Sequence, residues 1–245
     1  MSSELQRFTV PVIVRPKRRL GIFVLIDLGV IGAQKLVVLS DLHIGDPRTP
    51  DLTLSRIYGV IRDEKPAFLV LAGDILEGNL ATESQVYQLR NVCHAATRVV
   101  MVIGNHDGAP TQDLARSLHC PLDLRIAGTS GCRSFVIEHG HRFDRWWKRV
   151  PGLGGLGIWF NRILYRCTRF DLQEWTRRFG WVQRGLRRQH ARARAFWKTN
   201  DIVVTGHTHL PTNNPSVGYF NSGDWLVHRS YVVLHNGAAE LKELP

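Results

Sequence analysis

Five short apolar runs in this sequence are each followed by side chains that can bind a metal ion or move a proton. The polar segments that follow them are Asp41-Leu42-His43, Gly73-Asp74, Gly104-Asn105-His106-Asp107, His139-Gly140-His141 and Gly206-His207-Thr208-His209. Two Asp, one Asn and four His from this set offer oxygen and imidazole ligands without a thiolate, which suits Mn, Fe or Zn better than calcium or an iron–sulfur cluster. Seven ligands suit two ions about 3.5–4 Å apart that share one carboxylate. We therefore expect a dinuclear metal site.

The apolar runs must be short strands if they are to position these ligands. The runs are residues 35–40, 67–72, 99–103, 134–138 and 201–205, each rich in Val, Ile or Leu. Runs of this length and composition are typical of strands buried on both faces. The carboxyl ends of parallel strands share one edge of a sheet, so these ligands should converge there. Each of these motifs alone is compatible with an ordinary polar turn. Five of them in order, each at the end of a predicted strand, indicate a functional site.

Helical patterns separate the first three runs. Apolar residues recur at helical spacing in 52–63 and 82–97, which predicts crossover helices. Residues 217–221 and 231–235 read as further strands that close a second sheet. The neighbouring glycines permit tight turns and close approach of the backbone to a ligand.

The segment Arg142–Lys198 differs in composition from the rest of the chain. It contains 15 Lys or Arg against 3 Asp or Glu, a balance of +12, whereas the whole chain carries +11. It also holds six of the seven tryptophans. Residues 152–157 form a glycine cluster that we expect to be flexible, and Asp171–Lys198 reads as one long basic helix capped by Asp171.

Three interpretations of this basic, Trp-rich segment remain open. It can be a solvated basic face with core tryptophans, a nucleic-acid groove, or a surface for anionic lipid. Aromatic residues, among them Trp146 and Trp147, gather in the first half, and Arg184, Arg187 and Arg188 lie in the second. An apolar part beside a phosphate-facing part favours lipid, so we expect these five residues to bind substrate.

The remaining features describe one globular domain of 245 residues with its insertion at 142–198. Four dispersed cysteines without a C-x-x-C pair favour a reducing compartment. The sequence contains no run of 18 uncharged apolar residues, so it does not predict a transmembrane helix. Residues 8–14 and 22–26 read as extended segments around a basic turn, although a signal peptide is the alternative.

The ordered set of motifs resembles the calcineurin-like metallophosphoesterase superfamily from Lys35 to the C-terminus. The resemblance implies an α/β fold, a two-sheet αββα sandwich, with two divalent ions at one sheet edge. It implies that Asp41, His43 and His209 hold one ion, that Asn105, His139 and His207 hold the other, and that Asp74 bridges both. It also implies that His106 acts in catalysis beside the metals, with Asp107 as its orienting partner. We expect Mn²⁺, with Fe or Zn as alternatives.

Two features resemble the UDP-2,3-diacylglucosamine hydrolases within this superfamily. One is the helical insertion, and the other is Asn221-Ser222-Gly223-Asp224-Trp225, which is similar to that group's Asn-Thr-Gly-Asp-Trp. The implied activity is hydrolysis of a phosphoester or pyrophosphate bond in a lipid-linked or nucleotide-linked substrate. His141, two residues after an expected ligand, is a candidate substrate contact.

Two other functions stay open: a DNA or RNA phosphodiesterase with the same metal centre, and a non-catalytic scaffold of the same fold. The complete ligand set speaks against the scaffold, and nucleic acid is the less favoured partner. We expect a cytoplasmic enzyme that can lie peripherally on the inner, anionic face of a membrane.

Overall fold

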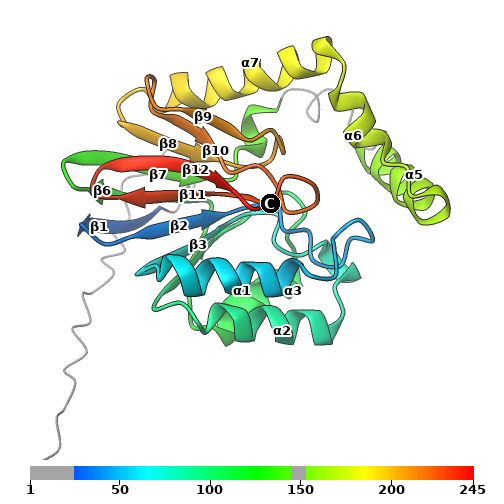
Figure 1. Ribbon diagram of the computed structural model, residues 1–245, viewed down its shortest axis with the longest axis horizontal. Coiled ribbons are helices and arrows are strands. Elements are labelled where there is room, and N and C mark those ends of the chain that lie inside the picture. Colours follow the sequence, from blue (N-terminus) through cyan, green and yellow to red (C-terminus); the bar gives the residue numbers. More distant parts are fainter. Residues whose placement is uncertain (1–24, 145–152) are drawn as a thin grey trace, which may run out of the picture.

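The computed structural model describes residues 25–144 and 153–245, and its framework is a pair of six-stranded sheets (Figure 1). Their strand orders are β12-β11-β2-β3-β4-β5 and β1-β6-β7-β8-β10-β9. The first sheet comprises β2 (Leu36–Leu39), β3 (Phe68–Ala72), β4 (Val99–Val102), β5 (Leu122–Asp123), β11 (Ser230–His235) and β12 (Ala238–Glu243). The second comprises β1 (Ile26–Gly32), β6 (Arg125–Ser130), β7 (Arg133–Glu138), β8 (Ile202–Thr205), β9 (Thr212–Asn214) and β10 (Tyr219–Asn221).

Helices cover both outer faces of the paired sheets (Figure 1). The helices on the first sheet are α1 (Thr53–Glu64), α2 (Glu83–Cys93) and α3 (Ala109–Ser117). Those of the insertion are α5 (Leu153–Thr168), α6 (Leu172–Arg177) and α7 (Gly180–Phe196), and single 3-10 turns lie at Gly78–Leu80 and His141–Phe143. The mixed α/β sandwich that the motifs imply is therefore confirmed.

Three apolar layers hold the sandwich together. Val38, Val70 and Phe135 belong to the layer between the two sheets, where strand side chains on facing surfaces interlock. Ile57 of α1 belongs to the layer under the helices of the first sheet, and Ala193 of α7 packs on the second sheet. Strands β2, β3 and β8 are buried along their whole length, as the uninterrupted apolar runs predict.

The chemistry-bearing strands divide between the two sheets. β2, β3 and β4 run parallel in the first sheet, and β7 and β8 run parallel in the second. The expectation that 217–221 and 231–235 both close the second sheet is wrong for β11, which pairs with β2 in the first sheet. The connection between β10 and β11, which contains the buried residues Asp224 and Trp225, leads the chain from the second sheet to the first.

The insertion also differs from the expected single helix. Asp171 caps α6 by accepting hydrogen bonds from the backbone N–H groups of Gln173 and Glu174, as predicted. The helix then ends at Arg177, and α7 begins at Gly180 after the extended residue Phe179. The extended backbone of Phe179, with φ −76° and ψ 128°, separates the two helices.

Three further expectations concern the segments beside these elements. The glycine cluster expected to be flexible is helical from Leu153, where each glycine in the helix interior costs about 0.5–1 kcal/mol relative to alanine. The extended segment 8–14 and the substrate-binding residues Trp146 and Trp147 lie outside the described residues. Within 25–144 and 153–245, every helix is too short or too polar to span a bilayer.

Candidate metal centre

The segments after β2, β3, β7 and β8 bring their polar side chains to one place. Asp41, His43 and His209 form one group whose ligand atoms lie within 4.8 Å of one another. Asp74, His139 and His207 form a second group by the same measure. The carboxyl edges of the two sheets meet here, so the convergence predicted from the strand ends is present, although across two sheets rather than along one.

Asp74 lies between the two groups. Its Oδ2 atom is 3.1 Å from Nε2 of His139 in the second group and 3.9 Å from Nε2 of His43 in the first. In the first group, Oδ1 of Asp41 is 3.1 Å from Nε2 of His209. The carboxylate of Asp74 therefore lies close to one histidine of each group, and its role as a bridge between two ions stays a prediction.

Left-handed backbone conformations aim the ligands at the centre. Asp41, His43, Asp74, His207 and His209 all have φ between 46° and 67°. Non-glycine residues with such values are uncommon, and clusters of them are typical of functional sites. Here each one turns the chain sharply where a strand ends, so that successive side chains face the same centre.

Two glycines make room for the acidic ligands. A Cβ atom at Gly104 would collide with the carboxylate and backbone nitrogen of Asp74, and one at Gly206 would collide with Ser40 and Asp41. The glycines that precede Asn105 and His207 are therefore required by close packing against the two aspartates.

The electrostatics of this cluster favour a cation. Burial alone lowers the pKa of His139, but attraction to Asp74 and Asp41 outweighs it and raises that pKa to about 10. Among the described residues, Oδ1 of Asp41 and Nε2 of His139 are buried without a hydrogen-bond partner. Buried charged oxygens and imidazole nitrogens without partners are costly unless a metal ion engages them. The residues present therefore fit a divalent metal centre.

The other nitrogens of these histidines are held by the protein. Nδ1 of His43 donates to Oε2 of Glu77 at 2.6 Å, and Nδ1 of His139 lies 3.0 Å from the carbonyl oxygen of Ala72. Metal-binding histidines usually make such a bond because it fixes the ring and leaves Nε2 for the ion. By its place in the same loop as Asp74, the sequence leaves Glu77 open as a residue that supports the ligands or as a plain turn residue, and in the structure it is bonded to the ring of His43.

His106 lies beside the first group, as expected, but its partner is different. Its ring packs edge-on against His43 with centroids 5.0 Å apart, and its Nδ1 donates to Oε1 of Glu77 at 2.6 Å. The expectation that Asp107 orients His106 is wrong, because both Asp107 oxygens accept hydrogen bonds from backbone N–H groups at 2.8–3.3 Å. Those N–H groups are orphaned by the sharp turns after β3 and β4.

Asn105 and His141 both lie at this centre. Asn105 lines the same 170 Å³ pocket as His43, Asp74, His207 and His209. His141 packs near His139 and His207, with ring centroids 5.6 and 6.3 Å apart. Burial and then the charge of His139 lower the pKa of His141 to about 4, which leaves a neutral ring beside the second group.

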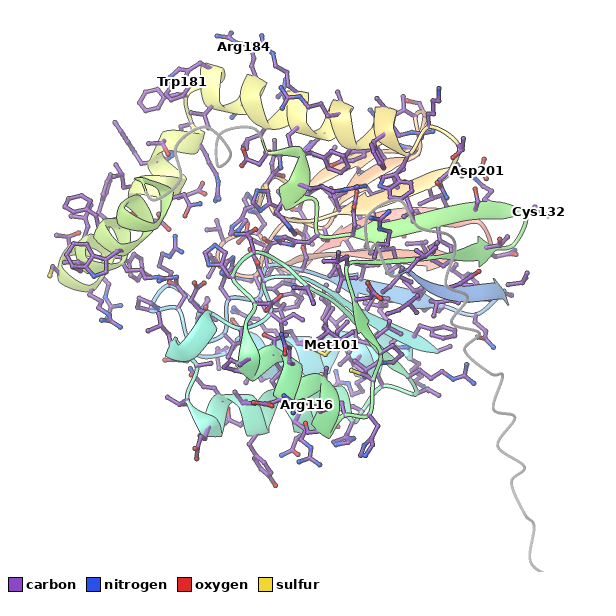
Figure 2. The ribbon with its side chains drawn as sticks, turned by 180° about the vertical axis from the view of Figure 1, so that it is seen from behind. Met101, Arg116, Cys132, Trp181, Arg184 and Asp201 are labelled. Atoms are coloured by element: carbon purple, nitrogen blue, oxygen red, sulfur yellow. The ribbon has the colours of Figure 1, made fainter. Side chains whose placement is uncertain are left out.

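The predicted basic residues of α7 separate in space. Arg188 lines a cavity of about 660 Å³ next to the centre, whereas Arg187 lines a different groove together with His190. Arg184 is exposed at the start of α7, beside Trp181 (Figure 2). Arg188 lies on the side of α7 that faces this cavity, and Arg187 lies on the side that faces the other groove. The structure does not bring Arg184 or Arg187 to the site.

Several side chains that sequence patterns did not single out line the metal-centre pocket. They include Arg48, Asp144, Gln173, Thr176 and Arg177. Most of them come from the insertion. Its basic composition does not show which face of each helix lines the pocket.

Comparison with known proteins identifies the family of this chain. The family model for calcineurin-like phosphoesterases matches residues 34–211. Among solved structures, the phosphoesterase YfcE from E. coli is 20% identical with a TM-score of 0.46, over 82% of this chain and 88% of that one. A dimetal phosphatase from Danio rerio is 11% identical with a TM-score of 0.48, over 86% of this chain and 96% of that one. Among curated proteins, none matches the sequence significantly. With the family model matching most of its length, the chain belongs to the calcineurin-like phosphoesterase family.

Proposed function

We propose that this protein hydrolyses a phosphoester or pyrophosphate bond in a substrate that carries a large apolar group, such as UDP-2,3-diacylglucosamine. The observation that carries the proposal is that two cavities adjoin each other. The 170 Å³ pocket at the metal centre and the 660 Å³ cavity beyond it share Asp144, Gln173, Thr176, Val182, Leu186 and Gln189 as lining residues. A phosphoryl group at the centre would therefore have space for an attached group beneath the insertion.

The chemistry of the larger cavity suits an amphipathic substrate. Trp181, Val182 and Leu186 give it apolar walls, and Arg188 and Arg192 add positive charge. Apolar walls with a few placed polar groups are the usual pattern of a small-molecule site. In this proposal, residues 142–198 are an insertion within a single domain and act as a cap over the substrate. The likeness of Asn221–Trp225 to the diacylglucosamine hydrolases points to the same substrate class.

The protein's own residues have separate roles in this reaction. Asp41, His43 and His209 would hold one divalent ion, Asn105, His139 and His207 the other, and Asp74 would bridge them. When bound, two such ions supply a hydroxide at neutral pH and neutralise the phosphoryl oxygens. Nδ1 of His106 is engaged by Glu77, so Nε2 is left to meet the departing oxygen and, when protonated, to donate its proton. Manganese is our proposed metal.

We also propose that the insertion lies against an anionic membrane surface. Trp159 of α5 and Trp181 of α7 are 58% and 60% exposed, and Phe160 of α5 and Trp175 of α6 are exposed as well. Exposed aromatic side chains beside arginines match the interfacial region of a bilayer.

A substrate panel in Mn²⁺ tests the proposed activity. We expect hydrolysis of an acylated UDP-sugar to exceed that of its deacylated form, of single-stranded DNA and of an aryl phosphodiester. Preference for DNA would replace our proposal with a nuclease.

Gly185 offers a matched test of the larger cavity. A Cβ atom there meets open space, so Gly185→Phe fills the cavity without a backbone clash. We expect a higher KM for the acylated substrate and unchanged hydrolysis of the aryl diester. Gly180→Phe is the control, since a Cβ at Gly180 also meets open space and this residue does not line the cavity.

A further inference from the structure

Glu77 connects two histidines of the site to the insertion. Its side chain is buried, with 5% exposed, and its two oxygens each accept a hydrogen bond from one imidazole. One imidazole belongs to His43, an expected metal ligand, and the other to His106, the expected catalytic group. The orientation of both rings therefore depends on where this one carboxylate is held.

Arg162 of α5 makes an ion pair with that carboxylate. Its Nη2 atom pairs with Oε1 of Glu77, and its Nε atom donates to Oδ2 of Asp46 at 3.0 Å. The planar guanidinium can engage two carboxylates at once, which the single ammonium of a lysine does less well. Arg162 lies 85 positions after Glu77 in the sequence, so this contact exists only when α5 is docked against the core.

A second set of contacts joins the insertion to the same loops. Arg48 donates to Asp46 through Nε at 2.8 Å and through Nη2 at 3.0 Å. Its Nη1 atom donates to Gln173 of α6 at 2.9 Å and lies 3.5 Å from Asp171. Asp46 and Arg48 are both buried. The insertion is thus tied to the loops after β2 and β3 through buried ion pairs, which break only at a substantial cost.

We propose that Arg162 is a positioning residue, which holds Glu77 so that this carboxylate orients both His43 and His106. Docking of the insertion and completion of the metal centre are then one event, because α5 supplies a group that the centre needs. This inference rests on the proposed metal-dependent hydrolysis and adds to it a residue outside the family's motifs.

The test compares Arg162→Gln and Arg162→Lys with Arg166→Gln, an exposed arginine of the same helix. The readouts are Mn²⁺ affinity and stoichiometry of the purified chain, kcat and KM for a small aryl phosphodiester, and Tm. Loss of a residue that supports a metal-binding histidine typically costs 10–100-fold in metal affinity or activity. We expect about that loss in Mn²⁺ affinity or kcat for Arg162→Gln, with little change in KM, partial recovery in Arg162→Lys, and wild-type values for Arg166→Gln.

A double-variant comparison separates positioning from general stabilisation. If Arg162 acts through Glu77, the variant that combines Arg162→Gln with Glu77→Gln should have the same kcat and Mn²⁺ affinity as Glu77→Gln alone. Multiplicative effects of the two substitutions, or wild-type kcat and affinity in Arg162→Gln, would overturn the inference. Should Arg162→Gln fail to fold, Arg162→Lys decides: a lowered Tm with wild-type kcat and affinity means a purely structural role.

Different measurements test the proposed function and the proposed role of Arg162. If the wild-type chain binds Mn²⁺ but hydrolyses no phosphoester, the proposed function fails, and the metal-affinity measurements still decide the role of Arg162.

Discussion

The carboxylate of Asp107 accepts a hydrogen bond from the backbone N–H of Asp74 at 2.8 Å, so one acidic residue holds the backbone of another. The same carboxylate accepts from the N–H groups of Ile75 and Gly104 and from the hydroxyl of Thr111. It therefore fixes the turns after β3 and β4, which carry Asp74 and His106.

Asp107→Ala should destabilise the protein by more than about 3 kcal/mol, since several backbone N–H groups would lose their acceptor and each such loss costs about 1–3 kcal/mol. Urea unfolding measures this. Thr111→Val removes only the hydroxyl and should cost about 1 kcal/mol. Equal stability of Asp107→Ala and wild type would contradict the role that we assign to this carboxylate.

Asp74→Asn should abolish activity and lower metal occupancy, because this carboxylate lies between the two histidine-containing groups. Metal analysis at saturating Mn²⁺ checks the occupancy, and a substrate assay checks the activity. A fully active variant, or one ion per wild-type chain, would remove the dinuclear assignment.

His106→Ala should lose turnover while it keeps both ions, because its ring is bonded to Glu77 and, in our proposal, acts on the substrate rather than on the metals. We expect kcat to fall by about 10²–10⁴-fold, as for other general acids. Loss of an ion from the variant would mean that His106 is a metal ligand.

His190 should make the folded state sensitive to acid. Its buried ring lies 2.7 Å from the hydroxyl of Thr208, and burial followed by repulsion from Arg187 lowers its pKa to about 4. Above pH 6.5 the ring is neutral in both the folded and unfolded states. Below pH 6.5 the unfolded chain binds the proton first, so the free energy of unfolding should fall by up to about 3 kcal/mol by pH 4.

The control for this pH dependence is His190→Gln, whose unfolding should lack that contribution. The difference in stability between the two proteins should therefore change between pH 6.5 and 4 and stay constant above. A constant difference over the whole range would show that His190 is protonated equally in both states.

Trp159→Ala combined with Trp181→Ala should weaken binding to anionic liposomes several-fold, because these exposed indoles would lose their place in the interface. Sedimentation with phosphatidylglycerol vesicles measures this binding. Tyr87→Ala, which replaces an exposed aromatic on α2, is the control and should bind like wild type. No liposome binding by the wild-type chain would reject the membrane proposal.

The fold class and a cluster of His and Asp side chains suited to a divalent metal could be predicted from the sequence. Uninterrupted apolar runs such as 67–72 are too short for a helix and typical of buried strands, and the ligands follow directly at their ends. The order of strands and motifs along the chain was sufficient to predict where these ligands lie, because residues that directly follow a strand must lie at its end.

The tertiary structure decided how side chains from distant segments pair. Asp107 follows His106 directly, yet Glu77 makes the hydrogen bond to that ring, because the turn geometry aims the Asp107 carboxylate at backbone N–H groups instead. Composition likewise showed that the insertion is basic. The orientation of α7 places Arg188, and not Arg187, in the cavity next to the metal centre. The docking of α5 places Arg162 against Glu77. Which face of a helix turns inward depends on contacts with the rest of the fold, and a charge pattern that covers the whole helix does not encode it.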